Sequence, residues 1–171
     1  MKIIVDGCDF TGKTTLINQL LQHYNSSKLS YLHFSYRDRR DYGFYNTMLD
    51  KVDFIADRHF LDEAIYPKVF NRLPGLVNVE FNELMEKCKD QDIKIIILTC
   101  SNEELLKRSK TRHGEEPEVL RNLIDINEKF IKLADIYDLQ VFDTTINNLD
   151  EIISYIEGEL KHEKYKSDLH K

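Results

Sequence analysis

The chain has 171 residues, of which 42% are hydrophobic and 32% are charged, and its formal net charge is −6. This composition indicates one folded domain with a core of useful size and excludes a disordered chain. The acidic balance argues against a protein that wraps duplex nucleic acid. No apolar run approaches the roughly 20 residues needed to cross a bilayer, and the opening MKIIVDG leads directly into a strand-like segment, so we expect neither a membrane partner nor a signal peptide. Three widely spaced cysteines without metal-binding spacing predict reduced thiols and a cytoplasmic location.

Five short segments rich in β-branched and apolar residues predict strands. In chain order they span residues 2–7, 30–35, 52–57, 93–100 and 139–144. Near-continuous apolar runs such as IIIL predict strands that are buried on both faces, as in a parallel sheet.

Helical patterns lie between and after these strands. They span residues 13–24, 60–73, 78–91, 101–109, 116–137 and 148–160. Pro117 suits the first turn of the longest one, whereas residues 162–171 lack apolar periodicity and are predicted to fray. The alternation predicts a three-layer α/β/α fold in a single domain over residues 1–171, with the loops that follow the strands gathered at one ligand-binding edge.

The loop after the first strand matches G-x-x-x-x-G-K-[ST], from Gly7 to Thr14, between a predicted strand and a predicted helix. Its backbone N–H groups can form a nest for phosphate oxygens, and the following helix adds its positive dipole end. Lys13 can reach the β- and γ-phosphates, and the hydroxyl of Thr14 can ligate Mg²⁺. We therefore expect a nucleoside triphosphate, with ATP as the default, at Gly7, Cys8, Asp9, Phe10, Thr11, Gly12, Lys13, Thr14 and Thr15.

Asp9 is unexpected inside a phosphate loop because its carboxylate and a triphosphate carry like charges. We expect it to point away from the triphosphate, and a sugar hydroxyl on an acceptor is one natural partner. A surface or capping role is the alternative. The loop after the second strand carries Arg37, Arg39 and Arg40, which suit a planar grip on a phosphate or are simply solvated charges.

Asp57 and Arg58 end the third strand. Asp57 can hold Mg²⁺ through water, accept a proton, or cap the following helix, and Arg58 can grip an acceptor. A basic stretch within residues 107–117 can close over phosphates as a lid and neutralise developing charge, or it can be a basic helix end that the helix dipole favours. Its cations are Lys107, Arg108, Lys110 and Arg112.

These segments, in this order, resemble the thymidylate kinase group of P-loop nucleoside and nucleotide kinases from residue 2 to about residue 156. GCDFTGKTT resembles the phosphate loop of that group, in which the aspartate that corresponds to Asp9 touches the 3′-hydroxyl of the acceptor. FSYR resembles the group's Phe-Pro-x-Arg motif, with Ser35 in place of proline. The resemblance implies that Phe34 and Arg37 bind the acceptor, with Arg37 on its monophosphate, and that the five strands lie in the order 2-3-1-4-5.

ADRHFLDEAIY resembles the group's Asp-Arg-Tyr segment, with His59 in place of tyrosine. The resemblance implies a catalytic role for Asp57 and acceptor binding for Arg58. KRSKTRHGEEPE resembles the arginine-bearing lid, and DTT at residues 143–145 lies where the fold usually places the base of the donor. The resemblance implies that Arg108 and Arg112 take part in catalysis. It also implies that Arg108, Asp143 and Thr144 bind ATP.

The chain departs from the group between Arg37 and Asp57. The group usually has a longer helical stretch there that recognises the base, and this chain has a shorter segment. Tyr42, Phe44 and Tyr45 there can stack on a base or pack in the core. The sequence thus predicts Mg-ATP-dependent phosphoryl transfer to a deoxynucleoside monophosphate such as dTMP. Alternatives are a deoxynucleoside, a hydroxyl on DNA, or a nucleotide-binding switch or ATPase without a small acceptor. Family members often dimerise through helices, and FLDEAIYPKVF offers a candidate homodimer surface.

Overall fold

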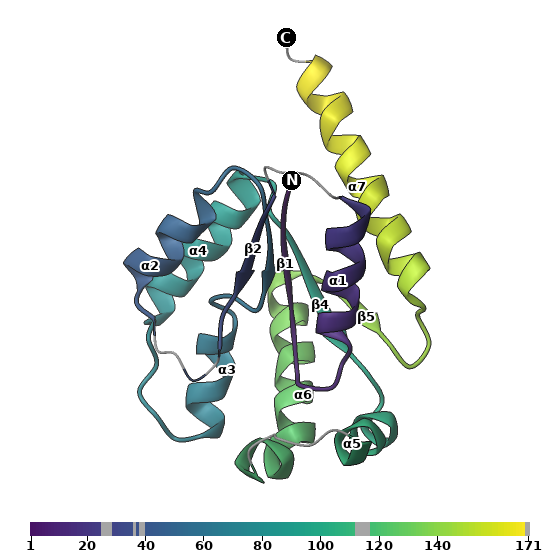
Figure 1. The fold of residues 1–171 in the computed structure, drawn as a ribbon. Coiled ribbons are helices and arrows are strands. Elements are labelled where there is room, and N and C mark those ends of the chain that lie inside the picture. The colour runs from purple at the N-terminus through teal and green to yellow at the C-terminus, as the bar shows by residue number, and fades with distance from the viewer. Residues whose placement is uncertain (25–28, 36, 38–39, 112–116, 170–171) are drawn as a thin grey trace.

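A computed structural model describes residues 1–24, 29–35, 37, 40–111 and 117–169, with side chains up to residue 160 (Figure 1). Arg39 and Arg112, two of the predicted cations, lie outside the described residues. Five strands form one parallel sheet with the order β2-β3-β1-β4-β5, which confirms the predicted fold class and strand order. The strands are β1 Lys2–Gly7, β2 Ser30–His33, β3 Phe54–Asp57, β4 Lys94–Thr99 and β5 Gln140–Asp143.

The register of the sheet brings the phosphate loop beside the end of the third strand. Val5 of β1 pairs with Asp57 of β3, and Asp57 in turn pairs with His33 of β2. Because all strands are parallel, their carboxyl ends open at the same edge. The loop after β1 and the last residues of β2 and β3 therefore meet there.

The described helices follow the predicted positions, with one addition. They are α1 Lys13–His23, α2 Tyr42–Leu49, α3 Asp62–Val69, α4 Asn78–Asp90, α5 Asn102–Thr111, α6 Pro117–Tyr137 and α7 Leu149–Leu169. Pro117 begins α6 as predicted, and the helical backbone of α7 runs into the segment that the sequence predicts to fray. The added helix is α2, whose N-cap Asp41 accepts a hydrogen bond from Phe44 N at 2.9 Å.

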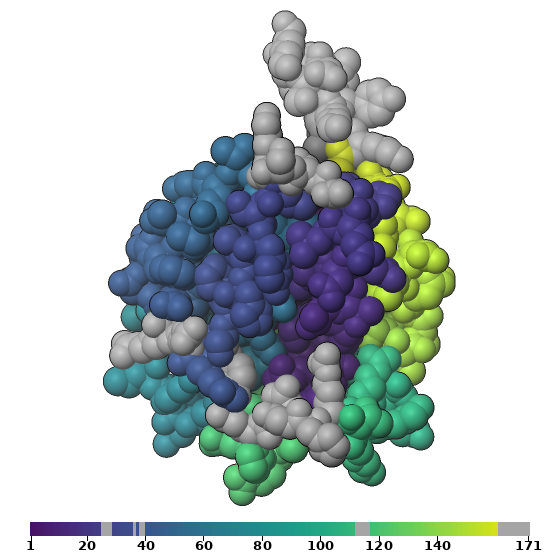
Figure 2. All heavy atoms as spheres, viewed as in Figure 1, coloured from purple at the N-terminus to yellow at the C-terminus, as the bar shows by residue number. Residues whose placement is uncertain are grey.

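Alternate residues of the central strands face two hydrophobic layers. Ile3 and Val5 pack with α1 and α7, whereas Ile4 packs with helices α2 to α6 on the opposite face. Figure 2 shows α1 in purple on the near face, between the β2 region in blue and α7 in yellow-green. None of the described helices is long and apolar enough to cross a bilayer.

Candidate active site

The phosphate loop follows a path that needs glycine at its first position. Gly7 has φ +137°, and a Cβ on it would lie 2.1 Å from the carbonyl oxygen of Leu98 on β4. Phe10 and Gly12 also have positive φ, at 67° and 96°. The loop therefore turns sharply between β1 and α1 and begins the helix at Lys13, as the motif predicts.

Lys13 is nearly buried and points into the loop that it follows. Its Nζ donates hydrogen bonds to the carbonyl oxygens of Gly7, at 2.9 Å, and Cys8, at 2.7 Å. Burial and the nearby Arg58 charge lower the pKa of Lys13. The ammonium is thus fixed at the centre of the loop.

Two side chains of the loop face the protein and leave only their backbone for a ligand. The hydroxyl of Thr11 donates to the carbonyl of Cys8 at 2.8 Å, and the thiol of Cys8 donates to the carbonyl of Leu123 on α6 at 3.3 Å. Burial raises the pKa of Cys8 well above its ordinary value, so the thiol stays protonated. Any contribution of these two residues to triphosphate binding must come from their N–H groups.

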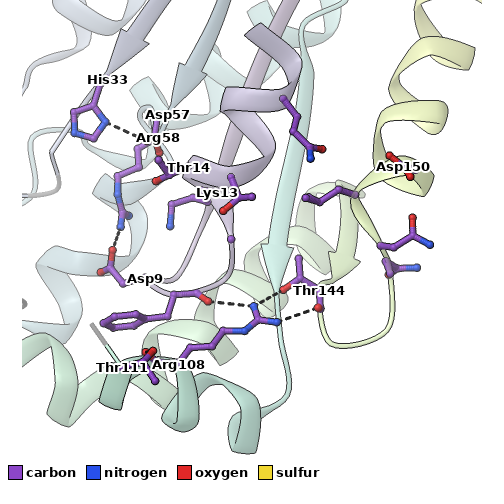
Figure 3. Close-up of a pocket in the computed structure, with 17 residues that line it drawn as sticks. Asp9, Lys13, Thr14, His33, Asp57, Arg58, Arg108, Thr111, Thr144 and Asp150 are labelled. Carbon is purple, nitrogen blue, oxygen red and sulfur yellow. Dashed lines mark hydrogen bonds and ion pairs between the residues drawn. The ribbon is translucent and has the colours of Figure 1, made fainter. Parts of the chain in front are cut away.

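A cleft of about 910 Å³ joins the phosphate loop to the other predicted segments (Figure 3). It is lined by the loop and α1, the ends of β2 and β3, α5, and the connection from β5 to α7. Asp57, Arg58, Arg108 and Thr144 all face it together with Lys13, so the structure gathers residues that are up to about 130 positions apart in the chain. Asp143 does not line it, because its carboxylate accepts from Thr145 N at 2.8 Å within the turn after β5.

Asp57 is buried at the end of β3 and shares one carboxylate oxygen with two residues of the edge strand. Tyr31 donates its hydroxyl to Oδ2 at 3.5 Å, and Nδ1 of His33 lies 3.3 Å from the same atom. The alternative that Asp57 caps α3 is wrong, because the N-cap of α3 is Leu61 and has no side-chain cap bond. Both Asp57 and His33 line the cleft.

A second carboxylate, Asp6, lies fully buried under the loop. It accepts hydrogen bonds from Gly7 N at 2.8 Å and from His59 N at 3.3 Å. Burial raises the pKa of Asp6 to about 6, against the opposing charges of Arg58 and Lys13. Asp6 thereby ties the backbone of the phosphate loop to the segment that follows β3.

Arg58 has φ 68° and turns its guanidinium into a buried cluster. Its Nη2 forms an ion pair with Asp9 across the cleft, as Figure 3 shows. Its Nη1 donates to Asp62 Oδ1 at 3.2 Å and to the hydroxyl of Tyr66 at 3.0 Å. Asp9 is therefore neither a surface nor a capping residue, and its partner in the structure is Arg58.

Arg108 holds two loops together at one side of the cleft. Its Nη1 donates to the carbonyl of Phe10 at 3.2 Å and to Oγ1 of Thr144 at 2.9 Å, and its Nη2 donates to the carbonyl of Thr144 at 3.1 Å (Figure 3). Glu104, one turn earlier on α5, accepts from its Nε at 2.9 Å. This arginine connects α5 to the phosphate loop and to the loop after β5, which a solvated helix-end charge would not do.

The aromatic residues predicted for the acceptor do not line the cleft. Phe34 and Phe44 pack edge to face with centroids 5.5 Å apart, and the Arg40 guanidinium lies 4.8 Å above the ring of Phe44. Tyr42 faces α4, where a hydrogen bond to Glu83 raises its pKa. Packing is thus the observed role of these rings.

Arg37 lies in the exposed turn after β2. Its backbone N–H donates to Oγ of Ser35 at 3.2 Å, so the residue that replaces the proline of the family motif helps to shape this turn. The side chain of Arg37 is exposed and does not line the cleft.

Sequence reasoning missed several residues of the site. His33 was inside a predicted strand, and only its place next to the FSYR segment pointed to the ligand edge. Asp62 and Tyr66 lie four residues apart, which puts them on one face of the helix that follows Arg58 and offered a usable signal. Asn147 and Asp150 line the far end of the cleft at the start of α7, and only the strand order could have placed them there.

Comparisons with known proteins agree with the fold. No family model matches the chain, and no curated protein matches it. The parallel sheet of order 2-3-1-4-5 with its phosphate loop is the fold of P-loop kinases.

Among solved structures, the chain is similar to the YorR protein from Bacillus subtilis, solved in complex with phosphorylated GDP. The TM-score is 0.81 and the sequence identity is 21%, and the match covers 96% of this chain and 98% of that one. It is also similar to a deoxyadenosine kinase from M. mycoides with dCMP and dCDP bound, with a TM-score of 0.53 and 19% identity, covering 95% and 100%. A gluconokinase from Sinorhizobium meliloti gives a TM-score of 0.55 and 12% identity, covering 99% and 96%. At these identities the likeness establishes a shared fold.

Proposed function

We propose that the protein transfers the γ-phosphoryl group of a Mg-bound nucleoside triphosphate, ATP by default, to a deoxynucleoside monophosphate such as dTMP. The observation that carries this proposal is one cleft in which Lys13 of the phosphate loop faces Asp57, Arg58 and Asp9 on one side and Arg108 on the other. A kinase needs a triphosphate site and an acceptor site in line across the transferred group. The names of the fold relatives, which include a deoxyadenosine kinase, support the same reaction class.

The donor side uses the phosphate loop. The N–H groups of the loop and Lys13 would hold the β- and γ-phosphates, and Arg108 with Thr144 would fix the loop that faces the donor base. An oxygen of the acceptor phosphate attacks the γ-phosphorus, the bond to the β–γ bridging oxygen breaks, and the nucleoside diphosphate leaves with that electron pair. Positioning and charge neutralisation supply most of the rate in such a step.

The cleft also suits Mg²⁺. Thr14 and Asp57 both line it and offer a hydroxyl and a carboxylate oxygen, and Mg²⁺ usually takes one or two protein oxygens plus phosphate oxygens and water. No group of three or more potential His, Cys, Asp or Glu metal ligands occurs among the described residues. When bound, the ion supplies neutralisation of charge on the triphosphate, while Asp57 stays oriented by Tyr31 and His33.

On the acceptor side, Asp9 would contact a sugar hydroxyl and Arg58 and Arg37 the monophosphate. A second candidate is a deoxynucleoside acceptor, which the structure favours through one observation: Arg58 is already paired with Asp9 and Asp62. An acceptor without a phosphate would not compete for that guanidinium. A hydroxyl on DNA and a switch or ATPase without a small acceptor stay alternatives.

Labelled ATP separates these candidates. The protein is incubated with [γ-³²P]ATP and each deoxynucleoside monophosphate, each deoxynucleoside, a DNA oligonucleotide, or no acceptor. We expect label on a monophosphate, a loss of transfer of at least about 100-fold in Lys13→Ala, and a rise in the acceptor KM in Arg37→Ala. Arg72→Ala, an arginine that lies over Phe70 away from the cleft, is the matched control. Label only on the oligonucleotide, or hydrolysis that no acceptor changes, would refute the proposal.

A further inference from the structure

The cleft extends beyond the phosphate loop to an end that lies away from the acceptor side. Asn147 and Asp150, beside the start of α7, line this end together with Gln19 of α1. Figure 3 shows Asp150 on the opposite side of the cleft from Asp9. Because the γ-phosphate of a donor has to face the acceptor, the sugar and base of that donor would extend from Lys13 toward Asp150.

The loop between β5 and α7 is held in shape by its own hydrogen bonds. Asn147 N donates to the carbonyl of Asp143 at 2.7 Å. Asn148 and Glu151 cap α7 reciprocally, because Asn148 N donates to Oε2 of Glu151 at 3.1 Å and Glu151 N donates to Oδ1 of Asn148 at 3.0 Å. The wall at this end of the cleft is therefore fixed by contacts within the protein.

Several polar groups at this end of the cleft lack partners among the residues that the structure describes. Within that part of the chain, the carboxylate of Asp150 forms no hydrogen bond or ion pair, and Oε1 of Gln19 is buried without a partner. Asn147 accepts a hydrogen bond from Asp143 N at 3.1 Å through Oδ1, so Nδ2 is the end of its amide that remains for a ligand. A few polar groups in the wall of a cleft are typical of a small-molecule site.

Guanine fits these groups better than adenine does. A carboxylate only accepts hydrogen bonds, and an amide NH₂ only donates them. The outer edge of guanine carries two adjacent donors, N1–H and the 2-amino group, beside the acceptor O6, so it can pair with both Asp150 and Nδ2 of Asn147. Adenine carries a single donor, the 6-amino group, beside the acceptor N1, whose lone pair a carboxylate repels. Gln19 has an amide that can turn to serve either base, so it adds no discrimination.

We propose that the donor is a guanine nucleoside triphosphate, whose N1–H and 2-amino group donate to Asp150 and whose O6 accepts from Asn147. This inference rests on the proposed function and replaces ATP, its default donor. Leu149 is half-buried, lines the same end of the cleft and offers an apolar surface to the base. Because the carboxylate of Asp150 repels adenine as well as binding guanine, it supplies specificity in addition to affinity.

Binding in the absence of an acceptor measures this preference directly. Isothermal titration calorimetry is done with Mg²⁺ and the β,γ-methylene analogues of GTP, ITP, ATP and XTP, which do not transfer their γ-phosphoryl group. We expect the GTP analogue to bind at least about 10-fold more tightly than the ATP analogue, which is the effect of one hydrogen bond to a charged group. The ITP analogue lacks the 2-amino group and should bind about 10-fold more weakly than the GTP analogue.

Substitutions that exchange donors and acceptors connect the preference to these residues. Asp150→Asn offers one acceptor and one donor, so it should lose at least about 10-fold in affinity for the GTP analogue and gain at least about 10-fold for the XTP analogue, which carries a carbonyl in place of the 2-amino group. Asn147→Asp keeps an acceptor for Asp143 N but removes the donor to O6, so it should weaken the GTP analogue. The matched control is Asp125→Asn, which breaks an exposed pair with Lys129 on α6 and should keep the wild-type order of affinities.

The outcomes separate this inference from the proposed function. If the ATP analogue binds as tightly as the GTP analogue, or if folded Asp150→Asn gains no affinity for the XTP analogue, the guanine assignment is wrong and the kinase assignment stands. If Asp150→Asn fails to fold, an unchanged affinity of Asn147→Asp for the GTP analogue overturns the guanine assignment. If the GTP analogue binds as expected but neither [γ-³²P]GTP nor [γ-³²P]ATP labels an acceptor, the proposed transfer is wrong and the guanine site stands. If no analogue binds, both are overturned.

Discussion

Replacing His59 by phenylalanine should make the protein more stable at neutral pH. The imidazole is fully buried among Phe34, Tyr45 and Phe60, with centroid distances from 5.1 to 5.5 Å. Neither ring nitrogen has a hydrogen-bond partner among the described residues. A buried polar group without a partner costs about 1–3 kcal/mol. The larger phenyl ring strains the packing and offsets part of this gain, so we expect the free energy of unfolding to rise by about 1–2 kcal/mol.

The same substitution should remove part of the acid sensitivity. Burial lowers the pKa of His59 from 6.5 to about 3. Below pH 6.5 the unfolded chain takes up a proton that the folded chain refuses, so this residue's contribution to stability is full above pH 6.5 and is lost as the pH falls toward 3. At about 1.36 kcal/mol per pH unit, the loss between pH 7 and pH 5 is about 2 kcal/mol.

Urea unfolding followed by circular dichroism at pH 7 and pH 5 measures both effects. His59→Phe should exceed the wild type by about 1–2 kcal/mol at pH 7 and by about 3–4 kcal/mol at pH 5. His23→Gln, on the surface beside Glu157, is the control and should follow the wild type at pH 7. If the advantage of His59→Phe were the same at both pH values, the imidazole would not be held neutral by burial, and the reasoning would be refuted.

Two further substitutions test the phosphate loop and the contacts of Arg108. Gly7→Ala would put a Cβ 2.1 Å from the carbonyl oxygen of Leu98 at φ +137°, so it should lower the free energy of unfolding by more than about 3 kcal/mol. The control is Gly158→Ala in α7, where a Cβ has nothing within 4 Å, and its free energy of unfolding should rise by up to about 1 kcal/mol. Similar urea midpoints for the two variants would contradict the strained loop. Arg108→Lys keeps the charge but loses the forked contacts to the carbonyl of Phe10 and to Thr144. One lost charged hydrogen bond is worth about 1.5 kcal/mol, so we expect the KM for ATP to rise about 10-fold. An unchanged KM would show that these contacts do not shape the donor site.

The fold was predictable because its strands and most of its helices carry strong local signals. Apolar runs mark β1 and β4, and apolar positions at helical spacing mark α6. The helix α2 was missed for a physical reason. It has eight residues with a glycine near its start, so its own propensity is weak. It forms because Asp41 caps it and because Tyr45 and Leu49 are buried against the core.

The candidate site was predictable only where spacing along the chain fixes geometry. The phosphate loop is such a case, because strand, loop and helix are contiguous. The brace that Arg108 makes with Thr144 joins residues 36 positions apart, and no periodicity encodes that contact. The orienting contacts of Tyr31 and His33 on Asp57 depend on the pairing of β2 with β3, which the sequence suggests only through a family resemblance.

Asp9 shows how a sequence question and a structural answer differ. A carboxylate in a phosphate loop predicts a partner that is not the triphosphate, and a sugar hydroxyl fits that prediction. The structure supplies Arg58 as the partner instead. Through its second oxygen, Asp9 also accepts a hydrogen bond from the hydroxyl of Tyr66 at 3.4 Å. An acceptor hydroxyl that reaches Asp9 would therefore have to compete with both partners, and separating a buried ion pair is costly because it leaves poorly hydrated charges.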